Sequence, residues 1–140
     1  MSVYLDASVL VALFTEDALT SRAVAFLQNS PTVVVISDFA AAEFASAIAH
    51  NVRIGQFAAE VALVVFSTFD AWTARETQRE QLTSADIVTA AAFIRRLDLA
   101  LRTPDAINIA IAQRIGADLV TFDGQMAAAG RALGMTVPLG

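Results

Sequence analysis

The chain has 140 residues, of which 56% are apolar and 16% charged, so we expect one compact domain and exclude a disordered or multidomain protein. The net charge of −5 and the absence of cysteine argue against non-specific nucleic-acid binding, disulfides and zinc–thiolate sites. All nine basic residues are arginines, which excludes Schiff-base lysine chemistry and a P-loop lysine.

The apolar runs of the chain are short. Those at residues 7–14 and 61–66 are far below the roughly 18 residues that a transmembrane helix needs. The first six residues carry no basic segment of the kind that begins a secretory signal. We therefore expect a soluble cytoplasmic protein with no membrane partner.

The first half of the chain alternates strand-like and helix-like segments. Residues 3–5 form a short apolar run closed by Asp6, and residues 33–36 are four β-favouring residues in a row. Ser37 and Asp38 are good N-cap residues in front of an alanine-rich segment. The predicted elements are a strand at 3–5, helices at 7–14 and 19–28, a strand at 33–36 and a helix at 39–50.

The second half continues this alternation. A helix is predicted from residue 56 to about residue 78, but residues 73–82 also fit a short edge strand. Capping signals at Thr83 and at Thr103-Pro104-Asp105 begin two more helices. These helices run to about residue 97 and to Gly116, and they are followed by a strand at 119–122, a helix at 125–133 and a last strand at 135–139.

Strands that alternate with helices through short loops pair in parallel with right-handed crossovers. We therefore predict a single domain over residues 1–140 with an α/β fold. It is a three-layer α/β/α sandwich around a short, mainly parallel sheet. In such sheets ligands bind beyond the carboxyl ends of the strands.

Four carboxylates are candidates for that edge of the sheet. Asp6 and Asp123 each follow a predicted strand, and Asp105 lies in the first turn of a helix. Glu43 lies in an otherwise apolar helix, where an unpaired carboxylate would be costly. Taken singly, each also fits a structural role, as a helix cap, a turn former or a half-exposed helix residue. Together they form the all-oxygen set that binds Mg²⁺ or Mn²⁺.

The remaining polar residues carry weaker signals. His50 is the single histidine, so we expect no histidine-based triad and no two-histidine metal site. Glu16, Asp17, Asp38 and Asp86 are interpreted as helix caps or solvated charges. Five arginines could line a substrate path: Arg75, Arg79, Arg95, Arg96 and Arg102. Of these, Arg75 and Arg79 alternate with Glu76 and Glu80 and fit a solvated helix face equally well.

Four segments contain the candidate carboxylates in a fixed order. They are Val3-Tyr4-Leu5-Asp6-Ala7-Ser8-Val9-Leu10, Ser37-Asp38 with Glu43, Arg102-Thr103-Pro104-Asp105-Ala106, and Gly116-Ala117-Asp118-Leu119-Val120-Thr121-Phe122-Asp123. Together, over residues 3–138, they closely resemble the motifs of PIN domains of the VapC toxin type. One departure is that residues 73–82 are more charged than the strand expected there.

The resemblance implies a Mg²⁺- or Mn²⁺-dependent endoribonuclease, a hydrolase that acts as the toxin of a VapBC-type toxin–antitoxin system. It assigns the catalytic and metal-binding roles to Asp6, Glu43, Asp105 and Asp123. Ser8 and Thr121 match positions that support the metal ligands. The implied partners are an RNA substrate, a VapB-like antitoxin and a second copy of the chain in a homodimer. The metal would activate a water molecule and neutralise charge on the scissile phosphate.

A second function class stays open, namely a non-catalytic, partner-binding PIN-like domain whose metal site is structural. It predicts co-purification of a partner without nuclease activity, whereas the nuclease requires Mg²⁺ or Mn²⁺ and stops with EDTA. A phosphatase or receiver-like site is disfavoured, because the chain has no lysine and because Ser8 stands where a second acid is needed.

Two further expectations concern the surface and the charge of the site. Residues 39–69 contain twelve large apolar side chains on two consecutive predicted helices, more than one side of a small sheet needs. This favours a groove or dimer surface that receives an amphipathic antitoxin helix, with an antitoxin arginine reaching the acidic cluster. Carboxylates that converge without metal repel each other, so at least one should have a pKa above its unfolded value.

Overall fold

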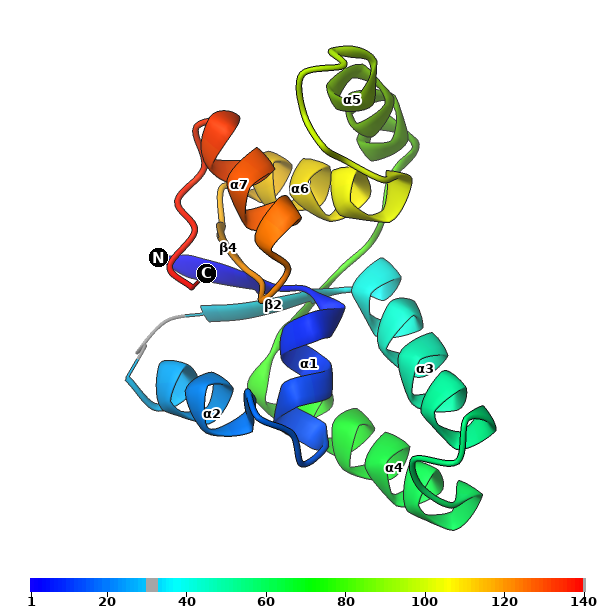
Figure 1. Cartoon of the computed structure of the whole chain (residues 1–140). Helices are drawn as coiled ribbons and strands as arrows, with labels where there is room; N and C mark the ends of the chain where they lie inside the picture. Colours follow the sequence, from blue (N-terminus) through cyan, green and yellow to red (C-terminus); the bar gives the residue numbers. More distant parts are fainter. Residues whose placement is uncertain (30–32, 140) are drawn as a thin grey trace.

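The protein folds around a four-stranded sheet (Figure 1). The computed structural model describes residues 1–29 and 33–139. The strands are β1 (Ser2–Leu5), β2 (Val33–Ser37), β3 (Gln78–Glu80) and β4 (Asp118–Val120), in the spatial order β3-β2-β1-β4. The three pairings between these strands are all parallel, so the predicted parallel sheet is confirmed.

The helices cover the two faces of the sheet. On one face lie α1 (Ala7–Phe14), α2 (Thr20–Gln28), α3 (Asp38–Arg53) and α4 (Ala59–Glu76), and on the other lie α5 (Ser84–Arg95), α6 (Thr103–Ile115) and α7 (Gly124–Ala132) (Figure 1). Each face of the sheet has its own hydrophobic core, because successive side chains of β1 point to opposite faces. Val3 and Leu5 pack with helices α1 to α4, and Tyr4 packs with helices α5 to α7. The predicted three-layer sandwich is confirmed. None of the described helices has both the length and the apolar content needed to cross a membrane.

Residues 73–82, which the sequence left between helix and strand, form both. Helix α4 ends at Glu76, two residues before the predicted end, and β3 follows as a three-residue edge strand. Its register places Gln78 beside Val35 of β2. A short, charged strand is suited to an edge, where unpaired backbone groups otherwise invite association.

The strand predicted at residues 135–139 is wrong. The Leu119 amide donates to the Thr136 carbonyl at 3.0 Å, but within residues 135–139 no strand ladder develops from this bond. Pro138 has no amide hydrogen to donate. The Val137 carbonyl accepts instead from the Arg131 guanidinium at 2.9 Å. The apolar pattern therefore reflects packing of Val137 in the core rather than strand pairing.

Asp86 is more than the cap or solvated charge that the sequence suggested. It forms the predicted capping box with Thr83 at the start of α5, but its side chain is only 2% exposed. Arg114 of α6 donates to its Oδ1 at 2.8 Å and to its Oδ2 at 3.0 Å. The same guanidinium donates to Glu80 of β3 at 3.0 Å. Arg114 therefore joins the edge strand, α5 and α6.

Candidate active site

Asp6 lies between β1 and α1, and it is almost completely buried. Its Oδ1 accepts hydrogen bonds from the Ser8 hydroxyl at 2.6 Å and from the Val9 amide at 3.2 Å, so Asp6 is the N-cap of α1. Its Oδ2 accepts from the Thr121 hydroxyl at 2.5 Å. Thr121 follows β4, the strand that pairs with β1. Two adjacent strand ends therefore hold this carboxylate.

Asp123 is tied to the same hydrogen-bond group. Its amide donates to Thr121 Oγ1 at 3.0 Å, and the Phe122 amide donates to Ser8 Oγ at 3.0 Å. The Asp123 Oδ1 accepts from two amides in the first turn of α7, which makes Asp123 the N-cap of that helix. Ser8 and Thr121, the two residues expected to support the site, therefore connect the Asp6 and Asp123 segments.

Glu43 reaches this region from α3. It is half-buried, and its Oε1 accepts a hydrogen bond from Asn108 Nδ2 at 2.7 Å. Asn108 belongs to α6, one turn beyond Asp105. Helices α3 and α6 cover opposite faces of the sheet (Figure 1). The hydrogen bond between Glu43 and Asn108 joins the second turns of these two helices.

Asp105 occupies the first turn of α6 and is 3% exposed. Its Oδ2 accepts from the Arg102 amide at 3.3 Å, and the Arg102 Nε lies 3.6 Å from the same oxygen. The Arg102 side chain is 76% exposed, so this pair adds little stability but places a positive charge beside the acidic residues. The role of a helix N-terminal acid, expected from the sequence, is confirmed for Asp105, and its other oxygen stays open.

Each of the four carboxylates keeps hydrogen-bonding capacity that no described residue uses. The open positions are Oε2 of Glu43, Oδ1 of Asp105, Oδ2 of Asp123 and one lone pair of Oδ2 of Asp6. Such an all-oxygen set fits Mg²⁺ or Mn²⁺. In residues 1–29 and 33–139, no three acidic or histidine side chains are placed together closely enough to hold a metal ion as they stand.

Burial dominates the electrostatics of this site. It raises the pKa of the Asp6 carboxyl above its ordinary value, and the charge of Asp123 acts in the same direction against the hydrogen bonds that Asp6 accepts. Burial also raises the pKa of Glu43, helped by the charges of Asp6 and Asp105. The predicted direction is confirmed. The principal cause is removal from water rather than the mutual repulsion that the sequence suggested.

Sequence reasoning missed the polar residues that surround Glu43. Asn108 is 1% exposed, and its Oδ1 accepts from the Tyr4 hydroxyl at 2.5 Å. The Tyr4 hydroxyl also bonds the Ser37 hydroxyl at 2.7 Å. A signal was available, because Asn108 is a single polar residue between Ile107 and Ile109 in an apolar helix. The argument that singled out Glu43 applies to it equally.

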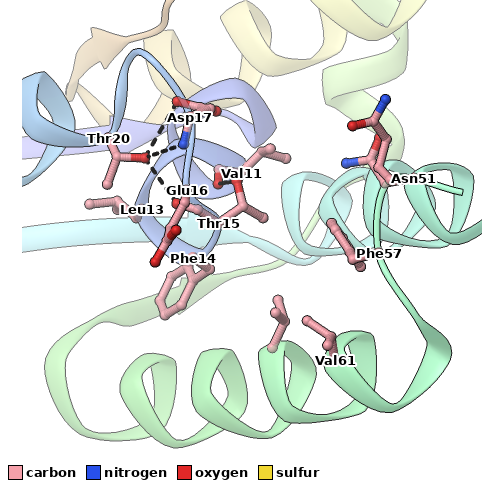
Figure 2. Close-up of a pocket in the computed structure, with 12 residues that line it drawn as sticks. Val11, Leu13, Phe14, Thr15, Glu16, Asp17, Thr20, Asn51, Phe57 and Val61 are labelled. Atoms are coloured by element: carbon pink, nitrogen blue, oxygen red, sulfur yellow. Dashed lines mark hydrogen bonds between the residues drawn. The ribbon is translucent and has the colours of Figure 1, made fainter.

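A groove lies at the other end of α1 (Figure 2). It has a volume of about 760 Å³ and is lined by the end of α1, the end of α3 and the start of α4. Figure 2 shows Phe14, Phe57 and Val61 around it, with Glu16 and Asp17 at the α1 side. The apolar residues at 39–69 are thus divided between core and surface. Phe44, Ile48 and Phe69 are buried, whereas Ile54, Val61, Leu63 and Val64 are exposed.

The sequence from residue 3 to residue 132 matches the family model of the PIN domain. The chain belongs to the PIN domain family. Comparison with curated proteins finds none that matches.

Solved structures share the fold of this PIN domain. VapC20 of Mycobacterium tuberculosis, described as a toxin that cleaves the sarcin-ricin loop, has a TM-score of 0.73 at 24% identity, covering 91% of this chain and 95% of its own. VapBC2 of Rickettsia felis, bound to promoter DNA, has a TM-score of 0.71 at 14% identity, with 100% and 99% covered. FitAcB of Neisseria gonorrhoeae has a TM-score of 0.71 at 16% identity, with 98% and 96% covered.

Proposed function

We propose that this PIN domain is a metal-dependent endoribonuclease, the toxin of a VapBC-type toxin–antitoxin pair. One observation carries the proposal: Asp6, Glu43, Asp105 and Asp123 come from four separate segments, and each keeps oxygen capacity that no described residue uses. The charge of Asp123 acts on Asp6, and the charges of Asp6 and Asp105 act on Glu43. The similarity of fold to VapC20, described as a toxin that cleaves the sarcin-ricin loop, supports a toxin that acts by cleavage.

In this proposal the carboxylates of the protein hold the cation, and the positive charge of the cation acts on the water molecule and on the phosphate. When bound, Mg²⁺ or Mn²⁺ would acidify a water molecule and neutralise charge on the scissile phosphate. Ser8 and Thr121 hold Asp6 in one orientation, so that little reorganisation is needed on binding. The exposed Arg102 offers a contact for the RNA backbone next to the acidic residues. The site needs no side-chain nucleophile.

The test is RNA cleavage by purified protein with Mg²⁺ or Mn²⁺, with and without EDTA. Asp6→Asn, Glu43→Gln and Asp105→Asn are each expected to lose about two or more orders of magnitude in rate, because an amide is a poorer ligand for a hard cation. Asp123→Asn should lose less, because it is expected to act as an outer ligand through water. Asp118→Asn is the matched control, since Asp118 is the first residue of β4 and lies at the amino ends of the strands, away from the four carboxylates.

Cleavage by Asp6→Asn at the wild-type rate would show that the assigned site is wrong. Folded wild-type protein that binds an antitoxin but cleaves no RNA under any metal condition would favour the non-catalytic, partner-binding alternative. The groove of Figure 2 is the observation that supports this alternative, because it could bind a partner without any catalysis.

The groove is the proposed docking site for an amphipathic helix of a VapB-like antitoxin. Its lining is half apolar, and Glu16 and Asp17 supply negative charge for basic residues of the partner. The first residue of α1 to line the groove is Val11, about 7.5 Å along the helix axis from Asp6. An antitoxin arginine would therefore have to reach along α1 to meet the carboxylates.

Val61→Asp is expected to weaken antitoxin binding at least tenfold without loss of folding, because Val61 is 48% exposed in the groove. Val88→Asp is the control, since Val88 is exposed on α5, on the other face of the sheet. The homodimer remains a prediction that light scattering of the isolated chain tests directly.

A further inference from the structure

A chain of hydrogen bonds runs from the sheet to Glu43 through Asn108. The Tyr4 hydroxyl of β1 bonds both Ser37, at 2.7 Å, and Asn108 Oδ1, at 2.5 Å. The Asn108 amide nitrogen donates to the Pro104 carbonyl at 3.0 Å and to Glu43 Oε1 at 2.7 Å. Asn108 therefore uses both hydrogens of its amide, and only one of the two stays within its own helix.

The direction of each bond in this chain is determined by its partners. The Pro104 carbonyl can only accept, so the amide nitrogen of Asn108 must face it and the amide oxygen must face Tyr4. Tyr4 has one hydroxyl hydrogen, which it donates to Asn108, so it accepts from Ser37. The Ser37 oxygen in turn accepts from the Ala40 amide as the N-cap of α3. The amide of Asn108 has no alternative orientation.

This chain is buried until it reaches Glu43. Tyr4 and Ser37 are 0% exposed and Asn108 is 1% exposed, whereas Glu43 is only half-buried. Among the described residues, Asn108 is the sole hydrogen-bond donor to Glu43. Glutamate has three side-chain torsions, and a single rigid donor restricts them at low entropic cost.

The bond to Glu43 is the only one of the three that leads out of the buried part of the protein. The bonds to Tyr4 and to the Pro104 carbonyl satisfy the amide oxygen and one amide hydrogen of Asn108 and link α6 to β1, and the second hydrogen also needs an acceptor because Asn108 is buried. The remaining hydrogen is directed to a carboxylate that is partly open to solvent. This third bond has a clear consequence at the candidate site, because it occupies Oε1 of Glu43 and leaves Oε2 for a cation.

We propose that Asn108 is a positioning residue, which orients the Glu43 carboxylate for divalent-metal binding and is itself held by Tyr4 and Ser37. The inference rests on the proposed metal-dependent function and assigns to it a residue outside the four carboxylates. Outer residues that hold a metal ligand commonly contribute ten- to a hundredfold to metal affinity.

The experiment measures the Mn²⁺ dissociation constant by titration calorimetry, without RNA. Four proteins are compared: wild type, Asn108→Ala, Glu43→Ala and the double variant. We expect Asn108→Ala to bind Mn²⁺ about tenfold more weakly than wild type. We expect the double variant to equal Glu43→Ala, because Asn108 acts through Glu43 and has nothing to orient once Glu43 is absent.

Unchanged Mn²⁺ affinity in Asn108→Ala would overturn the proposal. So would losses that add in the double variant, because a residue that merely stabilises the fold affects binding independently of Glu43. Absence of Mn²⁺ binding by folded wild-type protein would overturn the proposed metal-dependent function, and the role of Asn108 with it. The two failures are thus distinguishable.

Two further variants separate positioning from folding. Tyr4→Phe/Asn108→Leu replaces both buried partners with apolar groups of similar shape, which limits the destabilisation caused by an unpaired buried group. It should still show the tenfold loss of Mn²⁺ affinity. Thr73→Ala removes a buried hydroxyl that bonds only within α4, so it should retain wild-type Mn²⁺ affinity. Wild-type affinity in the Tyr4→Phe/Asn108→Leu protein would contradict the positioning role.

Discussion

Removal of Arg114 is expected to be the most costly single change to an ion pair in this fold. In Arg114→Met the Asp86 side chain, only 2% exposed, loses both charged hydrogen bonds. Stripping one partner from a buried pair costs about 3–5 kcal/mol. Arg114 is 33% exposed, so solvent can partly replace it, and we expect the lower end, about 3 kcal/mol. With an unfolding entropy of about 2.1 cal/mol/K per residue, this lowers the melting temperature by about 10 °C.

The loss should depend on pH, with a definite sign. Burial acts to raise the pKa of Asp86, but hydrogen bonds from Arg114 and Thr83 outweigh it and lower the pKa below its ordinary value. In the wild type this carboxylate therefore contributes stability above its unfolded pKa of about 4, and that contribution is lost as pH falls through the folded pKa. In Arg114→Met fewer hydrogen bonds oppose the effect of burial, so the pKa of Asp86 in the folded protein rises. The loss of stability caused by the substitution then grows as pH rises through this new pKa, because Asp86 becomes charged without its partner.

Urea unfolding followed by circular dichroism at pH 7.5 and pH 4 measures this difference. Glu80→Gln is the matched control, because it removes the partly exposed partner of Arg114 and should cost at most about 1 kcal/mol. Asp86→Asn/Arg114→Met should recover part of the loss, because no charge is left buried and the Thr83 amide keeps an acceptor. A loss in Arg114→Met no larger than in Glu80→Gln, or equal at both pH values, would refute this reasoning.

Three other predictions concern the core, a helix end and the acidic site. Phe44→Ala should cost about 3–5 kcal/mol in chemical unfolding, because Phe44 is 1% exposed and packs against Phe14, Phe66 and Phe69; a loss below 1 kcal/mol would contradict this packing. Gly116→Ala should cost about 1 kcal/mol because its φ is +69° with open space around it, whereas Gly124→Ala, without a positive φ, should cost nothing measurable. The raised pKa values of Asp6 and Glu43 favour folding at low pH, and this contribution weakens as pH rises through them. At neutral pH, Mn²⁺ at a hundredfold excess over its dissociation constant should raise the free energy of unfolding by about 2.7 kcal/mol relative to EDTA, because it binds only the folded protein. Asp105→Asn should melt higher than wild type in EDTA and respond less to Mn²⁺; equal Mn²⁺ shifts in melting curves would argue against a shared site.

Local signals in the sequence were enough to predict most of the architecture. Capping residues, apolar periodicity and β-branched runs act over a few neighbours, and they placed the elements to within about three residues. The parallel sheet followed from the alternation of strands and helices, which also brought Asp6, Asp105 and Asp123 to helix starts at one edge. The Glu43 position was predictable because a carboxylate in an apolar helix requires a partner.

Long-range contacts decided what the local signals left open. The partner of Glu43 is Asn108, 65 residues away, and the partner of Asp86 is Arg114, 28 residues away, so neither pair has a local signature. Residues 135–139 are apolar enough for a strand, yet the Arg131 guanidinium takes the Val137 carbonyl and Pro138 offers no donor. A buried polar group must find a hydrogen-bond partner wherever the packed chain provides one. The identity of that partner depends on which segments the tertiary fold brings together, and it cannot be predicted from composition and spacing.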